Sequence, residues 1–220
     1  MKLYPIQCGN FKLDGGAMFG VVPKSLWERT NPADSKNLIE LGTRSLLVED
    51  GKKLILIDCG LGNKQDEKFF GHYSLYGDES LDKNLKKFGF VREDITDVFL
   101  THLHFDHCGG AIEWNDDKTG YRPAFKNAQF WTNENHWQWA TEPNPREKAS
   151  FLKENILPMQ ESGQLQFLPT PKTGNYGFAP DLKMDVIFVD GHTEKQMLPV
   201  IQYQEKTIVF AADLIPTAGH

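Results

Sequence analysis

Three histidines and one aspartate lie within six consecutive positions of the chain, in the run THLHFDHCGG from Thr101 to Gly110. The protein has seven histidines in 220 residues, so this density and these offsets are not expected by chance. Imidazole nitrogens and carboxylate oxygens without thiolate are typical ligands of divalent transition metals. The run therefore predicts a metal site rather than a solvated polar turn.

The residues before the motif indicate how it is presented. The segment 95–101 is short and rich in β-branched and aromatic residues, which is typical of a buried strand. His102 and His104 stand two apart at its end, so both side chains should point to the same side. Asp106 and His107 follow in the turn. We expect two pairs of ligands, close enough together to hold two adjacent metal ions.

Two later strand-like runs also end in ligand-type residues. Residues 187–189 are apolar and are followed by His192, which we expect to be the third imidazole of the first ion. Residues 207–212 form another such run and lead to Asp213, whose carboxylate could bridge two ions. The predicted metal ligands are His102, His104, Asp106, His107, His192 and Asp213.

With these residues in place, the chain resembles the metallo-β-lactamase-fold hydrolase superfamily. The resemblance rests on the motif at 102–107, on Gly191-His192-Thr193, on Ala212-Asp213 and on the strand 54–60 with its Asp58. The stretches 13–20 and 213–216 are most similar to the branch of quorum-quenching lactonases and organophosphate-degrading relatives. The resemblance implies that Asp58 supports a ligating histidine from outside the metal shell.

The resemblance also implies a fold. We expect an α/β (α+β) four-layer αββα sandwich with the metals at one edge, formed by residues 1–220 as a single domain. In this family a last histidine, which completes the second metal site, lies some tens of residues beyond the bridging aspartate. Only seven residues separate Asp213 from His220, so we do not assign His220 to this role. We expect the C-terminal part of the domain to be missing from the chain.

Several elements can be assigned from local patterns. Residues 45–57 read as two strands joined by a tight turn at Asp50-Gly51. Helical patterns occur around residues 80–88, 132–141 and 146–156, and a strand is expected at 128–131. Strands and helices alternate over the whole length, with no linker-like segment.

The predicted chemistry is hydrolysis. A metal-bound water has a pKa lowered to about 7, and a hydroxide shared by two divalent ions would attack a lactone or a related ester. Zinc is the first expectation, and manganese, iron or cobalt would fit the same ligands. We expect Asp106 and Asp213 to serve in catalysis as well as in binding. Two alternatives stay open: a glyoxalase II-like thioesterase, and a non-catalytic metal-binding or regulatory protein.

The identity of the substrate is less well defined than the reaction. Lactonases of this branch often carry a tyrosine shortly after the bridging aspartate, and here residues 214–216 are Leu-Ile-Pro. Apolar side chains that could line a substrate pocket, or could simply pack in the core, are Met18, Phe19, Trp27, Phe69, Phe70, Tyr73, Trp137 and Trp139. His72 and His136 stand in polar, aromatic-rich stretches, and we expect them at the surface or in a pocket.

Composition limits the partners. The formal net charge is −6 without a basic cluster, which argues against nucleic acid as a partner. No apolar run approaches the roughly 18 residues of a membrane span. The three cysteines are widely spaced and favour a reducing compartment, so we expect a cytoplasmic protein. We expect a small-molecule substrate, and a homodimer as a family-level expectation.

Overall fold

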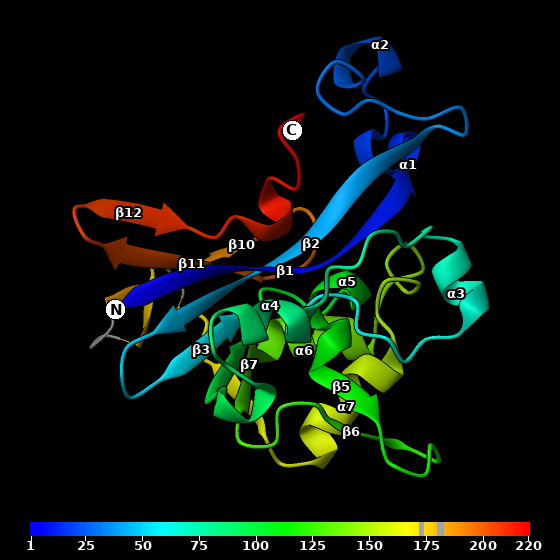
Figure 1. Ribbon diagram of the computed structural model, residues 1–220. Helices are drawn as coiled ribbons and strands as arrows, with labels where there is room; N and C mark the ends of the chain where they lie inside the picture. Colours follow the sequence, from blue (N-terminus) through cyan, green and yellow to red (C-terminus); the bar gives the residue numbers. More distant parts are fainter. Residues whose placement is uncertain (172–173, 180–182) are drawn as a thin grey trace.

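The computed structural model describes residues 1–171, 174–179 and 183–220, and its largest element is a six-stranded mixed sheet (Figure 1). Its strands, in spatial order, are β1 (Lys2–Asp14), β2 (Leu38–Glu49), β3 (Leu54–Ile57), β4 (Asp97–Phe99), β7 (Gln129–Asn133) and β8 (Leu165–Leu168). β1, β2 and β3 pair antiparallel, which confirms the hairpin predicted at 45–57. β3, β4, β7 and β8 run parallel to one another.

A second, antiparallel sheet packs on one face of the first. In spatial order it contains β12 (Lys206–Val209), β11 (Gln196–Tyr203), β10 (Met184–Val189) and β9 (Tyr176–Ala179). Buried side chains from both sheets meet between them, among them Ile57 and Phe99 from the first sheet and Val186 and Met197 from the second. A separate small hairpin joins β5 (Ile112–Trp114) to β6 (Tyr121–Pro123).

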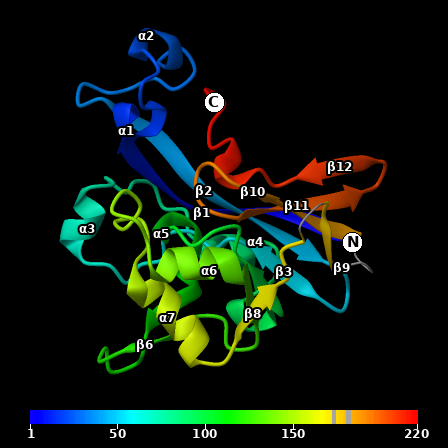
Figure 2. The same cartoon turned by 180° about the vertical axis from the view of Figure 1, so that it is seen from behind.

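Helices cover the opposite face of the six-stranded sheet, where Leu85, Trp137 and Ile156 pack against strand residues such as Val98 and Phe130. These three side chains belong to α4 (Leu81–Lys87), α6 (Glu134–Thr141) and α7 (Lys153–Glu161). The other helices of the described residues are α1 (Gly15–Phe19), α2 (Lys24–Trp27), α3 (Glu67–Gly71) and α5 (Phe105–Cys108), with 3₁₀ turns η1 (Arg92–Asp94), η2 (Gly109–Ala111) and η4 (Ala212–Leu214). From behind, the four-stranded sheet and α5–α7 lie on opposite sides of β1 and β2 (Figure 2). The layered α/β class predicted from the sequence is confirmed.

Two of the three helices predicted from the sequence are confirmed, and the third is shorter than predicted. Those expected around 80–88 and 132–141 correspond to α4 and α6. The prediction of a helix over 146–156 is wrong in its first half, because α7 begins only at Lys153. The Asn144 side chain accepts hydrogen bonds from the backbone N–H groups of Arg146 and Glu147. Such a local side-chain bond stabilises a turn in competition with the helix.

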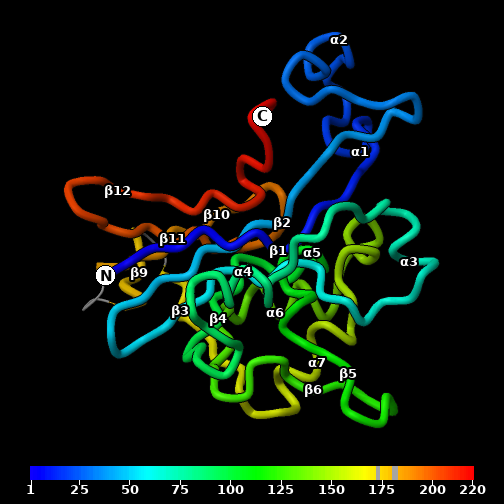
Figure 3. Tube along the Cα trace, viewed as in Figure 1, coloured from blue at the N-terminus to red at the C-terminus, as the bar shows by residue number. Residues whose placement is uncertain are grey.

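The chain leaves the main sheet between β1 and β2, where residues 15–37 form an excursion that carries α1 and α2 (Figure 3). The C-terminal segment runs beside it. His220 stacks on Phe19 with ring centroids 4.6 Å apart, and Thr217 donates a hydrogen bond to Asn31. Among the described residues, no helix has the length and apolarity that crossing a membrane requires.

Candidate metal centre

Four of the six predicted ligands, those of the motif at 102–107, follow the parallel strand β4, and Asp58 follows its neighbour β3. His192 and Asp213 follow β10 and β12 of the second sheet. The carboxyl ends of parallel strands are the usual place for sites in such sheets. Gly109 and Gly110 allow the chain after the motif to lie against the loop after β3. A Cβ on Gly110 would lie 2.1 Å from the carbonyl oxygen of Cys59, and one on Gly109 equally close to that of Leu61. Only glycine permits this close contact.

The first ligand set consists of three imidazoles. His104 Nδ1 lies 3.0 Å from His192 Nε2, and the rings of His102 and His192 are 5.1 Å apart. One nitrogen from each of the three histidines can be chosen so that all lie within 4.8 Å of one another. His102 and His104 are buried, whereas His192 is partly exposed and opens the set towards solvent. The structure thus brings together the three histidines that the sequence assigned to one ion.

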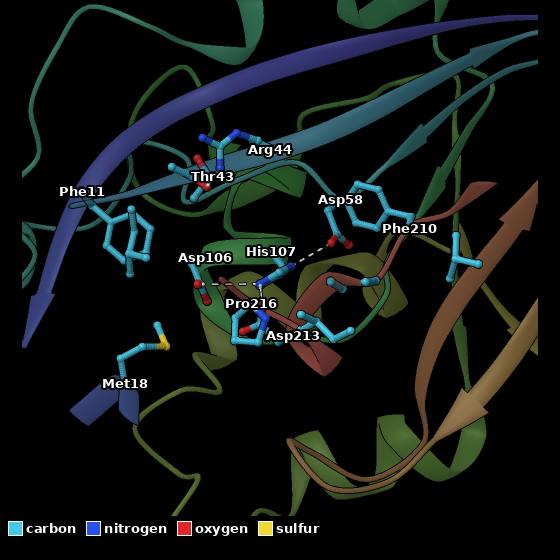
Figure 4. Close-up of a pocket in the computed structure, with 16 residues that line it drawn as sticks. Phe11, Met18, Thr43, Arg44, Asp58, Asp106, His107, Phe210, Asp213 and Pro216 are labelled. Atoms are coloured by element: carbon cyan, nitrogen blue, oxygen red, sulfur yellow. Dashed lines mark hydrogen bonds and ion pairs between the residues drawn. The ribbon is translucent and has the colours of Figure 1, made fainter. Parts of the chain in front are cut away.

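The second ligand set consists of His107, Asp106 and Asp213 (Figure 4). His107 Nε2 lies 3.3 Å from Asp213 Oδ1 and 3.7 Å from Asp106 Oδ2. The other oxygen of Asp213, Oδ2, lies 3.2 Å from His192 Nε2. The two oxygens of Asp213 therefore face the two sets, as a bridging carboxylate requires. His102 belongs to both sets, since one ligand atom each from His102, His107 and Asp213 also lie within 4.8 Å of one another.

Asp213 reaches this position differently from the prediction. β12 ends at Val209, and Asp213 stands in the 3₁₀ turn η4 instead of at a strand end. Ala212, with φ of 42°, adopts the left-handed conformation that places the next residue towards the histidines. A non-glycine residue rarely adopts this conformation, and such strain is concentrated at functional sites.

Asp58 organises the motif from behind. It accepts hydrogen bonds from the Thr101 backbone N–H, the Thr101 hydroxyl and His107 Nδ1, at 2.8, 2.8 and 2.7 Å. His107 Nδ1 must carry the hydrogen of the last bond, so Nε2 is the ring nitrogen that faces Asp213. Asp58 itself has φ of 57°, so the backbone is held in an unfavourable conformation to aim this carboxylate.

Thr101 also fixes the tautomer of His102. Its hydroxyl hydrogen is used towards Asp58, so the contact of 3.1 Å with His102 Nδ1 requires an N–H donated by the imidazole. The lone pair of His102 is therefore on Nε2. This nitrogen is buried and has no hydrogen-bond partner within the described residues. A buried acceptor without a partner is unfavourable unless a ligand engages it.

His136 is not a surface or pocket group, and that expectation is wrong. Its ring is fully buried, Nε2 accepts the backbone N–H of Leu103 at 2.9 Å, and Nδ1 donates to the carbonyl of Glu194 at 2.6 Å. The imidazole therefore joins the loop of His102 and His104 to the loop of His192. Burial lowers the pKa of His136 to about 4, so the ring stays neutral. His72 is exposed, as expected.

The two ligand sets differ in their electrostatics. Burial, reinforced by neighbouring imidazoles, lowers the pKa of His102 well below its usual range and that of His104 to about 2. Burial also opposes charge on His107, but the carboxylates of Asp106, Asp58 and Asp213 raise its pKa well above the usual range. Burial raises the pKa of Asp106. The charge of His107 outweighs burial at Asp213 and lowers its pKa to about 2.

Two neighbouring recesses that share lining residues lead to these groups, with volumes of about 300 and 530 Å³. Both are lined by Asp106, Asp213, Phe11, Met18 and Pro216, and the larger also by Tyr73, Arg146, His192 and His220. Of the apolar side chains considered for a pocket, Met18 and Tyr73 line it. Phe19 and Trp27 pack with Ile39 instead, and Phe69 and Phe70 pack around Phe105. Trp137 lies in the main core.

A protein-family model described as the metallo-beta-lactamase superfamily matches residues 38–220. The chain belongs to this superfamily. Among curated members, an N-acyl homoserine lactonase from Bacillus cereus is 22% identical over 218 residues, covering 94% of this chain and 73% of that protein. A segment of 70 residues, 32% of this chain, is 33% identical to the transcription termination factor FttA of Methanocaldococcus jannaschii and covers 9% of that factor.

Solved structures of the superfamily are similar over nearly the whole chain. A probable metal-dependent hydrolase from Staphylococcus aureus is 29% identical with a TM-score of 0.87, covering 100% of this chain and 75% of that one. AidC, a dizinc quorum-quenching lactonase, is 23% identical with a TM-score of 0.70, covering 97% of this chain and 71% of that one. The similarity to AidC shows that the two proteins share a fold.

Proposed function

We propose that this member of the metallo-beta-lactamase superfamily is a metal-dependent hydrolase that cleaves a lactone or a related ester with the help of two divalent ions. The observation that carries the proposal is the position of Asp213, whose two oxygens face two adjacent ligand sets at 3.3 and 3.2 Å. An ion pair that only stabilises the core does not require three histidines, His102, His107 and His192, around one carboxylate.

The donor set fits divalent metal ions. His102 Nε2 is a buried lone pair without a protein partner, and it points to where the other imidazoles converge. His102, His104 and His192 would hold one ion, and Asp106 and His107 the other, with Asp213 between them. Such nitrogen and carboxylate donors suit zinc first, and also manganese, iron or cobalt. Bound there, the ions supply a hydroxide at neutral pH and positive charge for the developing oxyanion.

The remaining tasks fall to side chains of the chain itself. Asp58 and Thr101 engage Nδ1 of His107 and of His102, so that each ring presents its Nε2 to the centre. Asp106 and Asp213 are the carboxylates that line both recesses, and either can hold a proton in transit to a leaving alkoxide. Phe11, Met18 and Pro216 provide apolar walls next to these groups, as a small-molecule site requires.

The substrate class is supported by the relatives. Lactonases occur among both the curated members and the solved structures that this chain resembles. The residues after Asp213 are Leu214, Ile215 and Pro216, and none of their side chains has an acidic group that could protonate a leaving group. We therefore propose an ester-like bond as the target without a fixed preference for acyl-homoserine lactones.

The test combines metal analysis with a substrate panel. Protein purified without added metal is assayed for metal content, and for hydrolysis of lactones, aryl esters, thioesters, β-lactams and phosphotriesters before and after chelation. Two ions per chain and chelator-sensitive turnover of lactones or esters are expected. Preferential turnover of thioesters would replace the substrate class, and absence of metal and of all turnover would overturn the proposal.

A further inference from the structure

The loop between α6 and α7 places one more carboxylate beside the metal centre, that of Glu147. Its Oε2 accepts hydrogen bonds from Trp139 Nε1 at 3.0 Å and from the Thr193 hydroxyl at 2.9 Å, while Asn144 Nδ2 donates to Oε1 at 3.3 Å. The side chain of Glu147 is only 15% exposed. These donors hold the carboxylate in one orientation, and none of them neutralises its charge.

The same oxygen faces a nitrogen that has no partner. His104 Nε2 is buried, makes no hydrogen bond within the described residues, and lies 3.9 Å from Glu147 Oε2. The other ring nitrogen, Nδ1, points to His192. A nearby carboxylate favours the hydrogen on Nε2, because an N–H directed at a negative oxygen is attractive and a lone pair there is repelled. The Nδ1 lone pair of His104 is then free for an ion.

We infer that Glu147 is a positioning residue for the first ion. It fixes His104 in the Nε2–H tautomer and, through its hydrogen bond with Thr193, holds the loop of His192 so that His192 Nε2 stays close to His104 Nδ1. The inference rests on the proposed function. Glu147 does for His104 what Asp58 does for His107. Carboxylates that accept the second N–H of a ligating histidine typically change metal affinity or activity by about 10 to 100-fold.

The alternative is that Glu147 only ties two loops together. Trp139 of α6 and Thr193 of the loop after β10 both donate to its Oε2, so removing the side chain would lower stability alone if this were its only role. A graded pair of variants separates these roles. Glu147→Gln keeps an oxygen that can accept from both donors but loses the charge, whereas Glu147→Ala loses both. Glu142→Ala is the matched control, because Glu142 is exposed at the C-terminal end of α6, where the loop that carries Glu147 begins.

The experiment measures the affinity of the full chain for Zn²⁺ by competition with a chromophoric chelator, the absorption spectrum of the Co²⁺ form, and the melting temperature without metal. We expect Glu147→Ala to weaken the binding of the first ion by about 10 to 100-fold, and Glu147→Gln to weaken it less. Both should change the Co²⁺ spectrum. Glu142→Ala should match the unmodified protein. Unchanged affinity and spectrum in both Glu147 variants would overturn the inference, even if they melt earlier.

A measurement without metal distinguishes failure of this inference from failure of the proposed function. Nitrogen-15 NMR of the metal-free protein reports which nitrogen of His104 carries the hydrogen. We expect the Nε2–H form in the unmodified protein and a mixture of tautomers in Glu147→Ala. If the unmodified protein binds no ion, the proposed function fails, and this tautomer shift alone decides whether Glu147 positions His104. A His104 that is Nδ1–H in the unmodified protein contradicts the inference.

Discussion

The two halves of the proposed metal centre meet at Asp213 but differ in their electrostatics. The half around His102, His104 and His192 is a nitrogen pocket in which burial lowers the pKa of every imidazole. The half around His107 is surrounded by three carboxylates, which raise the pKa of that imidazole. The first half therefore keeps neutral lone pairs available, and the second attracts positive charge.

The difference shows how one motif can serve two purposes. His104 and His107 are three positions apart, yet His104 has a single carboxylate behind it at 3.9 Å and His107 has one at 2.7 Å. Neutral imidazoles favour a transition metal over a hard cation, while the anionic half supplies carboxylates that can also move protons. Four experiments would break or sharpen this contrast.

The largest effect is expected from removing the nitrogen pocket. In His102→Ala, and in chelated protein, hydrolysis should fall by about 10³-fold, since the metal contributes several kcal/mol of transition-state stabilisation. Initial rates on the best ester substrate give the measurement. His72→Ala, at an exposed histidine, is the control and should be fully active. Full activity in chelated protein would mean that the nitrogen pocket does not hold a catalytic ion.

The next largest effect concerns the neutral imidazole of His136, which joins the two loops of the first half. His136 has a folded pKa of about 4 against about 6.5 when unfolded, so the unfolded state binds the extra proton. Above pH 6.5 the ring is neutral in both states, so His136 does not affect the free energy of unfolding. As the pH falls below 6.5 the free energy of unfolding decreases, by about 3 kcal/mol at pH 4.

The matching variant is His136→Gln, which should be less stable at pH 7.5 because buried hydrogen bonds to Leu103 and Glu194 are altered, but should lose less on acidification. Urea unfolding of metal-free protein at pH 7.5 and 4.5 measures both. Equal acid sensitivity in the variant and the unmodified protein would show that His136 is not the group responsible.

A smaller effect is expected behind the anionic half. Asp58→Asn preserves a residue that tolerates positive φ, but it loses the charge that orients His107. Metal affinity or activity should fall by about 10 to 100-fold. Asp185→Asn, at an exposed aspartate of β10, is the matched control. If metal titration shows that Asp58→Asn weakens neither ion, Asp58 has a purely structural role.

The smallest effect is expected at His220. Both of its ring nitrogens already contact Thr217 and the carbonyl of Met18, and its ring stacks on Phe19. His220→Ala should therefore retain the metal content of the unmodified protein, with at most a modest change in KM from the larger recess. Metal analysis by mass spectrometry gives the answer. Loss of one ion would make His220 a ligand and change the composition of the anionic half.

Local sequence was sufficient for much of the centre. The offsets of His102, His104, Asp106 and His107 place four ligand-type side chains in one turn after a buried strand, whatever the rest of the chain does. The hairpin at 45–57 and the strand leading to Asp58 were equally readable, because apolar β-branched runs and an Asp-Gly turn have few other uses. The helix misassigned at 146–156 shows the limit, since one Asn side chain redirected the backbone.

The sequence by itself determined which residue types could bind metal and the fold class that presents them. Only the tertiary structure decided the roles of Glu147 and His136, the tautomers of the imidazoles, and the two-sided position of Asp213. Glu147 meets Thr193 across 46 positions of sequence, and His136 meets Glu194 across 58. No local periodicity encodes such pairs, because the contact depends on how separate loops pack at one edge of the sheets. Charge, burial and tautomer follow from that packing.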